Sequence, residues 1–236
     1  MTVVLVFMAG LAVVAGWWLS RQKLSATPWL ASGVEEFAQV AMPPPAPAAK
    51  VGLGVFMAVA ASLLVLMISA YFMRMDMPDW VPPPRPALLW VNTGVLVVAS
   101  LAMHHASVAA GQGDREGVKA GLVGGTVATV AFLVGQVLAW RELAAAGYVP
   151  ASNPADAFFY LITAAHGLHV IGGLVALART SAKLRRGVAM DRLRLSVELS
   201  ATYAHFLLFA WLVLFSVLSF APQIDWLVAI CTAPFR

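Results

Sequence analysis

Charged residues are scarce in this chain. Only 11% of its 236 residues are Asp, Glu, Lys or Arg, whereas 61% are hydrophobic. A soluble globular domain carries about 25% charged residues, so this composition excludes a soluble protein and also a disordered one. A single cysteine, Cys231, excludes a disulfide scaffold. Most of the chain must therefore face lipid or other apolar helices.

Motifs of self-sufficient catalysts are also missing. The sequence has no phosphate-binding loop, no Gly-rich dinucleotide fingerprint, no C-x-x-C-H for covalent heme and no serine-centred elbow. These absences exclude the common nucleotide-dependent and hydrolytic enzyme classes.

Six long apolar runs are present instead. Spanning a bilayer takes about 20 apolar residues in a helix, and an open β-structure cannot cross lipid because its edge groups would stay unsatisfied. We therefore predict an all-α integral membrane protein with six transmembrane helices, at residues 3–20, 51–73, 87–110, 118–140, 157–179 and 195–220.

The first run stands apart from the other five. A signal peptide begins with basic residues, but here Arg21 and Lys23 follow the run, so we expect a retained helix. The linker behind it contains a Pro-Pro-Pro-Ala-Pro run from Pro43, which favours an extended conformation. We predict two parts: 1–49, the N-terminal helix with its Pro/Ala-rich linker, and 50–236, a five-helix bundle.

The basic residues predict the orientation. With six helices, one set of alternate loops holds Arg21, Lys23, Lys50, Arg115, Lys119, Arg179, Lys183, Arg185, Arg186, Arg192 and Arg194. The other set holds only Arg74, Arg85, Arg141 and Arg236. Because cytoplasmic loops are rich in Lys and Arg, we expect both termini to be periplasmic, in a bacterial inner membrane. The net charge of +4 then requires no nucleic acid, since anionic lipid headgroups are the simpler partner.

Glycines mark positions where helices can approach closely. Gly121 and Gly125 form a G-x-x-x-G in the fourth run, and Gly167, Gly172 and Gly173 interrupt the fifth. Such spacing favours close helix contact in membranes, although Gly is also simply common there. We predict helix packing at these five glycines.

Polar residues inside the last two runs share helix faces. His166 and His169 are three residues apart, and Glu198 and His205 are seven apart with Thr202 between them. Polar groups in lipid must find partners, so we predict a buried polar network in which Glu198 bonds to His166 or His169. Two other interpretations stay open: a metal or heme site with neutral His ligands, and a proton-conducting site.

Two late segments resemble one protein family. The segment 158–173, F-F-Y-L-I-T-A-A-H-G-L-H-V-I-G-G, resembles the F-F-x-L-T-x-x-H-G-x-H-V-x-x-G motif of subunit III of heme-copper respiratory oxidases. The set that is similar to that family's next helix, E-x-x-x-x-Y-W-H-F-x-x-x-x-W, is Glu198, Tyr203, His205, Phe206 and Trp211. Residues 50–56 and 88–93 also match its earlier helices.

The chain departs from that family at three points. Ala60 stands where the family commonly has a carboxylate, and Leu208 stands where it has an aspartate near the end of the last helix. Longer members place two helices before the linker, whereas this chain has one predicted helix. The first departure puts a buried-carboxylate role in doubt, and the last indicates a different amino-terminal contact surface.

The resemblance implies an accessory subunit of a terminal heme-copper oxidase, such as cytochrome c oxidase, in an aerobic respiratory chain. It implies partners, namely the oxidase catalytic subunit I and other oxidase subunits, which hold the heme and copper. It also implies phospholipid in the cleft between two helical lobes and support of proton uptake and complex stability. On this basis we expect no catalytic, cofactor-binding or metal-binding residues in this chain.

Two alternative functions remain. One is a subunit-III-like protein that serves nitric oxide reductase assembly or activation. The other is a secondary transporter, a class that tends to show internal repeats and discontinuous helices, and no convincing repeat is present in this sequence.

Overall fold

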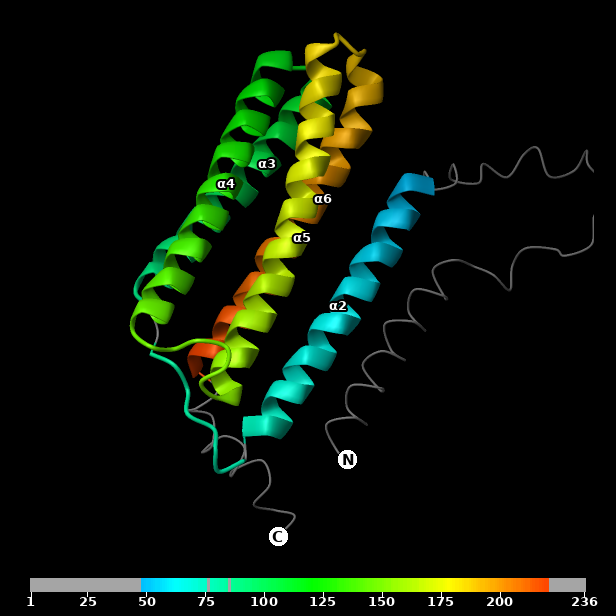
Figure 1. The fold of residues 1–236 in the computed structure, drawn as a ribbon. Coiled ribbons are helices and arrows are strands. Elements are labelled where there is room, and N and C mark those ends of the chain that lie inside the picture. Colours follow the sequence, from blue (N-terminus) through cyan, green and yellow to red (C-terminus); the bar gives the residue numbers. More distant parts are fainter. Residues whose placement is uncertain (1–47, 76, 85, 221–236) are drawn as a thin grey trace, which may run out of the picture. The chain divides into compact units, whose positions relative to one another are not determined.

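Five helices make up nearly all of the described chain. The structure, a computed structural model, describes residues 48–75, 77–84 and 86–220. Its helices are α2 (Ala48–Met75), α3 (Leu88–Gln112), α4 (Arg115–Ala145), α5 (Pro154–Arg185) and α6 (Met190–Phe220) (Figure 1). All five are long and apolar enough to cross a membrane. The prediction of an all-α membrane protein is therefore confirmed for these residues. The predicted helix at 3–20 lies outside the described residues, so the total of six helices stays a prediction.

α4 and α5 begin before their predicted apolar runs, and each begins at a polar cap. Asp114 Oδ1 accepts hydrogen bonds from Glu116 N and Gly117 N, both at 3.1 Å, at the start of α4. Asn153 Oδ1 does the same for the first amides of α5, accepting from Ala155 N at 2.7 Å. Such caps satisfy amides that have no partner within the helix. Hydropathy alone marks only the part of each helix that matches hydrocarbon.

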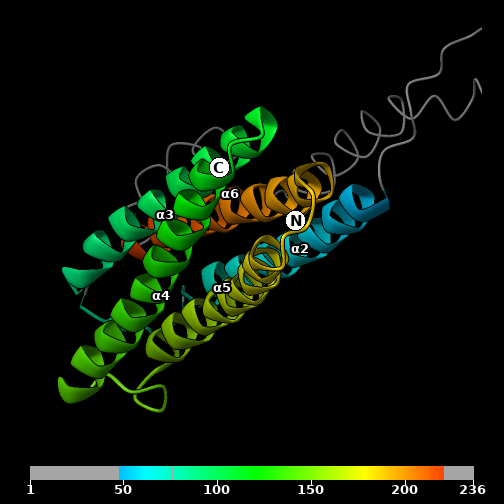
Figure 2. The same ribbon diagram turned by 90° about the horizontal axis from the view of Figure 1, so that it is seen from above.

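Consecutive helices run in opposite directions along the bundle (Figure 1). The most extensive helix pair is α3 with α4, and α6 packs against α3, α5 and α2 (Figure 2). α2 touches only α5 and α6 extensively, and its buried residues are Ala60 and Tyr71 alone. α2 is therefore the peripheral helix of the described bundle.

The glycines of α4 allow α3 to approach closely. A Cβ added to Gly121 would lie 2.7 Å from Ala102 O and from the Cβ of Ala106, both on α3. A Cβ on Gly125 would lie 2.8 Å from the sulfur of Met103. At Gly121 the obstacle includes backbone atoms of α3, so the α3–α4 packing seen here requires glycine at that position. At Gly125 the obstacle is the end of the flexible Met103 side chain, which would have to shift.

The glycines of α5 behave differently from one another. A Cβ on Gly173 would lie 3.2 Å from Leu207 and Tyr203 side chains of α6. At Gly167 and Gly172 an added Cβ would meet no atom within 4 Å. Of the three glycines predicted to pack, only Gly173 has side chains of a neighbouring helix close to the position of an added Cβ. The spacing of glycines along one helix does not tell where the neighbouring helix lies.

Candidate functional site

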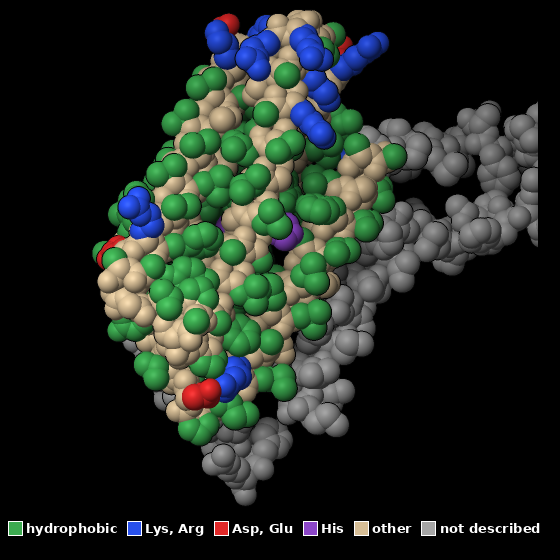
Figure 3. All heavy atoms as spheres, in the orientation of Figure 1, with side chains coloured by type: hydrophobic (Ala, Val, Ile, Leu, Met, Phe, Trp, Pro, Cys, Tyr) green, Lys and Arg blue, Asp and Glu red, His purple; other side chains and the backbone are tan. Residues whose placement is uncertain are grey.

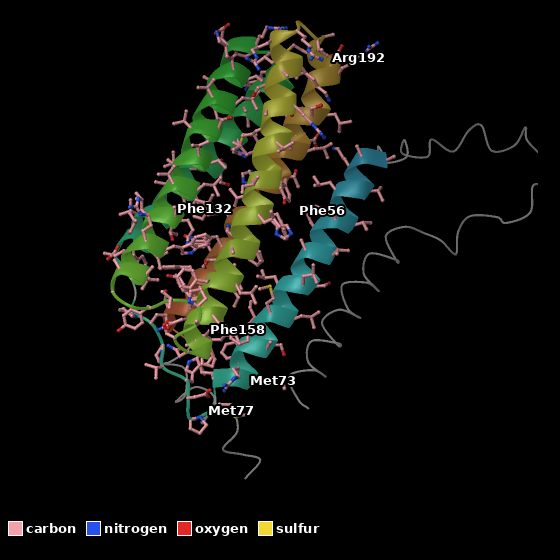
Figure 4. The ribbon with its side chains drawn as sticks, in the orientation of Figure 1. Phe56, Met73, Met77, Phe132, Phe158 and Arg192 are labelled. Carbon is pink, nitrogen blue, oxygen red and sulfur yellow. The ribbon has the colours of Figure 1, made fainter. Side chains whose placement is uncertain are left out.

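His166 is the deepest of the five polar residues singled out in the sequence. Its side chain on α5 is 5% exposed, and its ring lies 5.8 Å from that of Phe132 on α4 and 5.2 Å from that of Trp211 on α6, between centroids. Phe132, which contacts the His166 ring, is labelled in Figure 4. Within the described part of the chain, Nε2 of His166 has no hydrogen-bond partner. His166 is therefore packed among aromatic rings.

His169 lies one turn further along α5 and faces α2 and α6. Its Nδ1 lies 2.8 Å from Ala165 O on its own helix, and its ring centroid is 6.2 Å from that of Phe56, which projects from α2 (Figure 4). Tyr203 on α6 donates its hydroxyl to His169 O at 3.1 Å. This bond joins α6 to α5 through a backbone carbonyl.

Glu198 pairs with α2 instead of with a histidine of α5. Lys50 Nζ donates to Glu198 Oε1 at 2.5 Å, and both side chains are about 40% exposed in this chain. Thr202, which is exposed, donates to Glu198 O at 2.9 Å. The sequence-based prediction considered only α5 and α6, but α2 brings a cation to the carboxylate, and an ion pair outcompetes a neutral partner.

His205 contacts α3. Its Nδ1 lies 2.5 Å from the hydroxyl oxygen of Ser100, and its ring centroid lies 5.8 Å from that of His104. His205 is exposed in this chain, whereas Ser100 is buried.

The structure thus does not gather the five polar residues into one network. His166 on α5 packs between rings of α4 and α6, and His169 on α5 packs against Phe56 of α2. Glu198 pairs with Lys50 of α2, His205 contacts Ser100 of α3, and Thr202 bonds to a carbonyl of its own helix. Only His166 is fully buried. This differs from the predicted single buried network, because α6 is covered by three helices and each side chain meets the nearest one.

These positions do not assemble a metal site. Within residues 48–75, 77–84 and 86–220, no three His, Cys, Asp or Glu side chains come close enough to hold one metal ion. Structural and catalytic metal sites in proteins use three or four such ligands. The described side chains therefore offer no three-ligand set for a metal ion.

Two buried amides were missed by the sequence analysis. Asn92 on α3 and Gln136 on α4 are 2% and 3% exposed, and Asn92 Nδ2 and both polar atoms of Gln136 lack partners among the described residues. A Cβ on Gly135 would collide with the amide of Asn92. The sequence contains a signal for both residues, since each amide interrupts an apolar run. The sequence-based prediction considered only charged and histidine residues.

An apolar cavity lies beside the histidines. It has a volume of about 520 Å³ and lies between α2, α5 and α6. Its lining is apolar apart from His166 and His169, and it includes Ala60, the position where the resembled family commonly has a carboxylate. No acid of the described chain lines this cavity.

An ion pair and aromatic rings hold the loop that follows the C-terminal end of α2. Arg74 donates from both terminal nitrogens to the carboxylate of Asp79, and this hydrogen bonding lowers the pKa of Asp79. Trp80 follows and its ring lies 4.9 Å from that of Tyr71 and 5.9 Å from that of Phe158, between centroids. The loop after α2 is thereby fastened to α2 and α5.

Known proteins match most of this bundle. The family model described as cytochrome c oxidase subunit III matches residues 50–221. A probable cytochrome c oxidase subunit 3 of Mycobacterium bovis is 33% identical over 150 residues, which cover 60% of this chain and 71% of that protein.

Two further relatives extend the match. A cytochrome c oxidase subunit 3 of Synechocystis is 28% identical over 170 residues, covering 70% of this chain and 72% of that protein. One of Thermostichus vulcanus is 28% identical over 172 residues, covering 71% and 84%. The matched region contains α3 to α6, nearly all of α2, and both late motifs. The chain therefore belongs to the cytochrome c oxidase subunit III family.

Proposed function

We propose that this chain is the accessory subunit III of a bacterial terminal heme-copper oxidase, which supports the catalytic subunit without binding heme or copper itself. The observation that carries the proposal is the family match over residues 50–221. The names of the matched relatives indicate the class of complex. Electron transfer to oxygen then takes place in partner subunits.

The arrangement of polar side chains supports an accessory role. The bonds Lys50–Glu198, Ser100–His205 and Tyr203–His169 each join two different helices. Bonds of this kind stabilise helix association in a membrane, where unsatisfied polar groups are costly. The polar residues therefore act mainly as links between helices.

The charge distribution supports a cytoplasmic contribution to proton uptake. Lys and Arg side chains gather at the end of the bundle where α5 joins α6 (Figure 3). By the positive-inside rule this end faces the cytoplasm. If the predicted helix at 3–20 is added to the five described helices, the expected side of both termini is the periplasm. The positive electrostatic potential of these side chains is reduced locally by Asp114 and Glu116. It would influence the access of water and protons to the proton-entry path of the catalytic subunit. The chain need not carry the protons itself.

Comparing the oxidase with and without this chain tests the proposal. Oxygen consumption at several pH values, the number of turnovers before inactivation and the heme spectrum are measured for both preparations. We expect intact heme and copper centres, with slower proton uptake or a shorter working life in the depleted complex.

Other outcomes would overturn it. Loss of the heme-copper centres would make the chain an assembly factor, and unchanged kinetics and lifetime would remove the supporting role. Co-purification with nitric oxide reductase subunits in place of oxidase subunits would favour a role in the assembly or activation of nitric oxide reductase.

A further inference from the structure

A groove of about 640 Å³ runs between α4 and α5 at the basic end of the bundle. On the α4 side its wall begins with Arg115 and Lys119 and continues with Val123 and Val127. These residues recur at every fourth position, so they share one face of the helix. The charged side chains lie near the end of α4, at the mouth of the groove, and the two valines lie further along the helix, exposed on its surface.

The α5 wall has the same order of polarity. Arg185 lies at the mouth, followed by Ser181 and then Ala178. Arg115 Nη2 donates to Leu184 O at 2.5 Å, which holds its guanidinium across the mouth from α4 to α5. A guanidinium has five N–H donors, so this bond leaves others for a ligand.

The mouth is positively charged. Lys119 Nζ lies 3.5 Å from the carboxylate of Glu116, and both side chains are largely exposed. Among the described residues, Glu116 is the only acid lining the groove, against the three cations Arg115, Lys119 and Arg185. Neither arginine forms an ion pair with another described residue. The excess of cations favours an anion at this position.

The groove has the length of one lipid leaflet. From Arg115 to Val127, α4 rises about 18 Å at about 1.5 Å per residue. The hydrocarbon core of a bilayer is about 30 Å thick, so the groove runs from the headgroup level to near the midplane. Basic pockets between transmembrane helices are a known form of anionic headgroup site.

We propose that this groove binds one anionic phospholipid. Arg115, Lys119 and Arg185 hold its phosphate, and one acyl chain lies along Val123 and Val127. The site lies between α4 and α5 at the basic end of the bundle. It goes beyond the proposed function, since binding can be measured on the purified chain whatever complex the chain serves.

Native mass spectrometry of the full-length chain in mild detergent tests the headgroup contacts. The probes are phosphatidylglycerol and phosphatidylcholine with identical acyl chains. We expect one phosphatidylglycerol to bind preferentially, and K119Q/R185Q to weaken it by about 25-fold, about fivefold for each cation removed. Phosphatidylcholine binding should change little.

A matched control removes two cations from the same end of the bundle. Arg186 and Arg192 are exposed and do not line the groove, so R186Q/R192Q should leave phosphatidylglycerol affinity nearly unchanged. If both double variants weaken phosphatidylglycerol binding equally, the lipid is attracted by the general positive charge of the surface and the proposal is overturned. Equal affinity of the wild-type chain for both lipids would do the same.

A second pair of variants tests the apolar part. Val127 and Val134 are both exposed on α4, at 63% and 54%, but only Val127 lines the groove. Val127→Trp should remove the bound phosphatidylglycerol, whereas Val134→Trp should retain it. Retention in both variants would contradict an acyl chain in this groove.

Two further arms distinguish other occupants. Displacement of the lipid by millimolar inorganic phosphate would show a free-anion site and overturn the lipid assignment. In the intact complex, a photo-crosslinker at Val127 should label lipid. Labelling of a partner subunit's helix in its place would show that the groove is a protein interface.

Discussion

His205 on α6 and Ser100 on α3 lie 2.5 Å apart, between the imidazole Nδ1 and the hydroxyl oxygen. The bond joins residues that are 105 positions apart in the chain. It ties α6, which carries one of the two late family motifs, to α3. A contact of this kind should be measurable as an energetic coupling.

We expect Ser100→Ala and His205→Ala to be coupled in a double-mutant cycle of unfolding free energy. Hydrogen bonds between transmembrane helices contribute about 0.6 kcal/mol on average, so the coupling should be of that order. The measurement is reversible unfolding in detergent. Ser107→Ala, on the same helix, combined with His205→Ala should be additive; an additive Ser100–His205 cycle would contradict the bond.

The ion pair between Lys50 and Glu198 should depend on charge and be independent of which helix carries which sign. Glu198→Gln should lower thermal stability slightly, because partly exposed ion pairs contribute about 0–1 kcal/mol. Exchanging the charges in K50E/E198K should recover most of the loss. If the exchanged chain is no more stable than either single variant, the pair contributes nothing to α2 docking.

Close packing between α3 and α4 should make Gly121 sensitive to one added methyl group. Gly121→Ala would drive its Cβ into the backbone of Ala102, and overpacking of this kind costs about 1–3 kcal/mol. Gly167→Ala is the control, since nothing lies within 4 Å of that Cβ. Equal stability of the two variants in thermal unfolding would contradict the packing described here.

The Asp79 carboxyl should titrate at lower pH than an ordinary aspartate, because Arg74 hydrogen-bonds to its charged form. Its folded-state pKa is depressed, so its contribution to stability is present above the unfolded-state pKa and is lost as the pH falls through the folded-state value. Carbon-13 NMR of labelled Asp should show a higher pKa for Asp79 in Arg74→Gln. An identical titration in both chains would exclude the ion pair in solution.

The basic end should be accessible from the cytoplasm. In a chain whose Cys231 is replaced by Ser, Lys183→Cys should react with a membrane-impermeant maleimide only in inverted vesicles. Met77→Cys, exposed in the loop after α2, should react only from the periplasmic side. Labelling of Lys183→Cys in intact spheroplasts would reverse the orientation.

The sequence by itself determined the membrane class, the positions of five helices and the family. These properties follow from local quantities: an apolar run long enough for the bilayer predicts a helix wherever it occurs. The segment 158–173 and the set from Glu198 to Trp211 indicated the family without any knowledge of packing. The part at 1–49 and its separation from the bundle stay predictions.

Only the tertiary structure decided the partners of each polar side chain and glycine. Helical spacing tells which residues share a face, but it does not tell which helix covers that face or at what depth. Glu198 was expected to meet α5 and meets Lys50 of α2, and Gly167 has open space where Gly121 has a backbone. The buried amide of Asn92 and the groove beside Lys119 likewise arise from residues on separate helices. Their proximity depends on interhelical packing, which no single run of sequence contains.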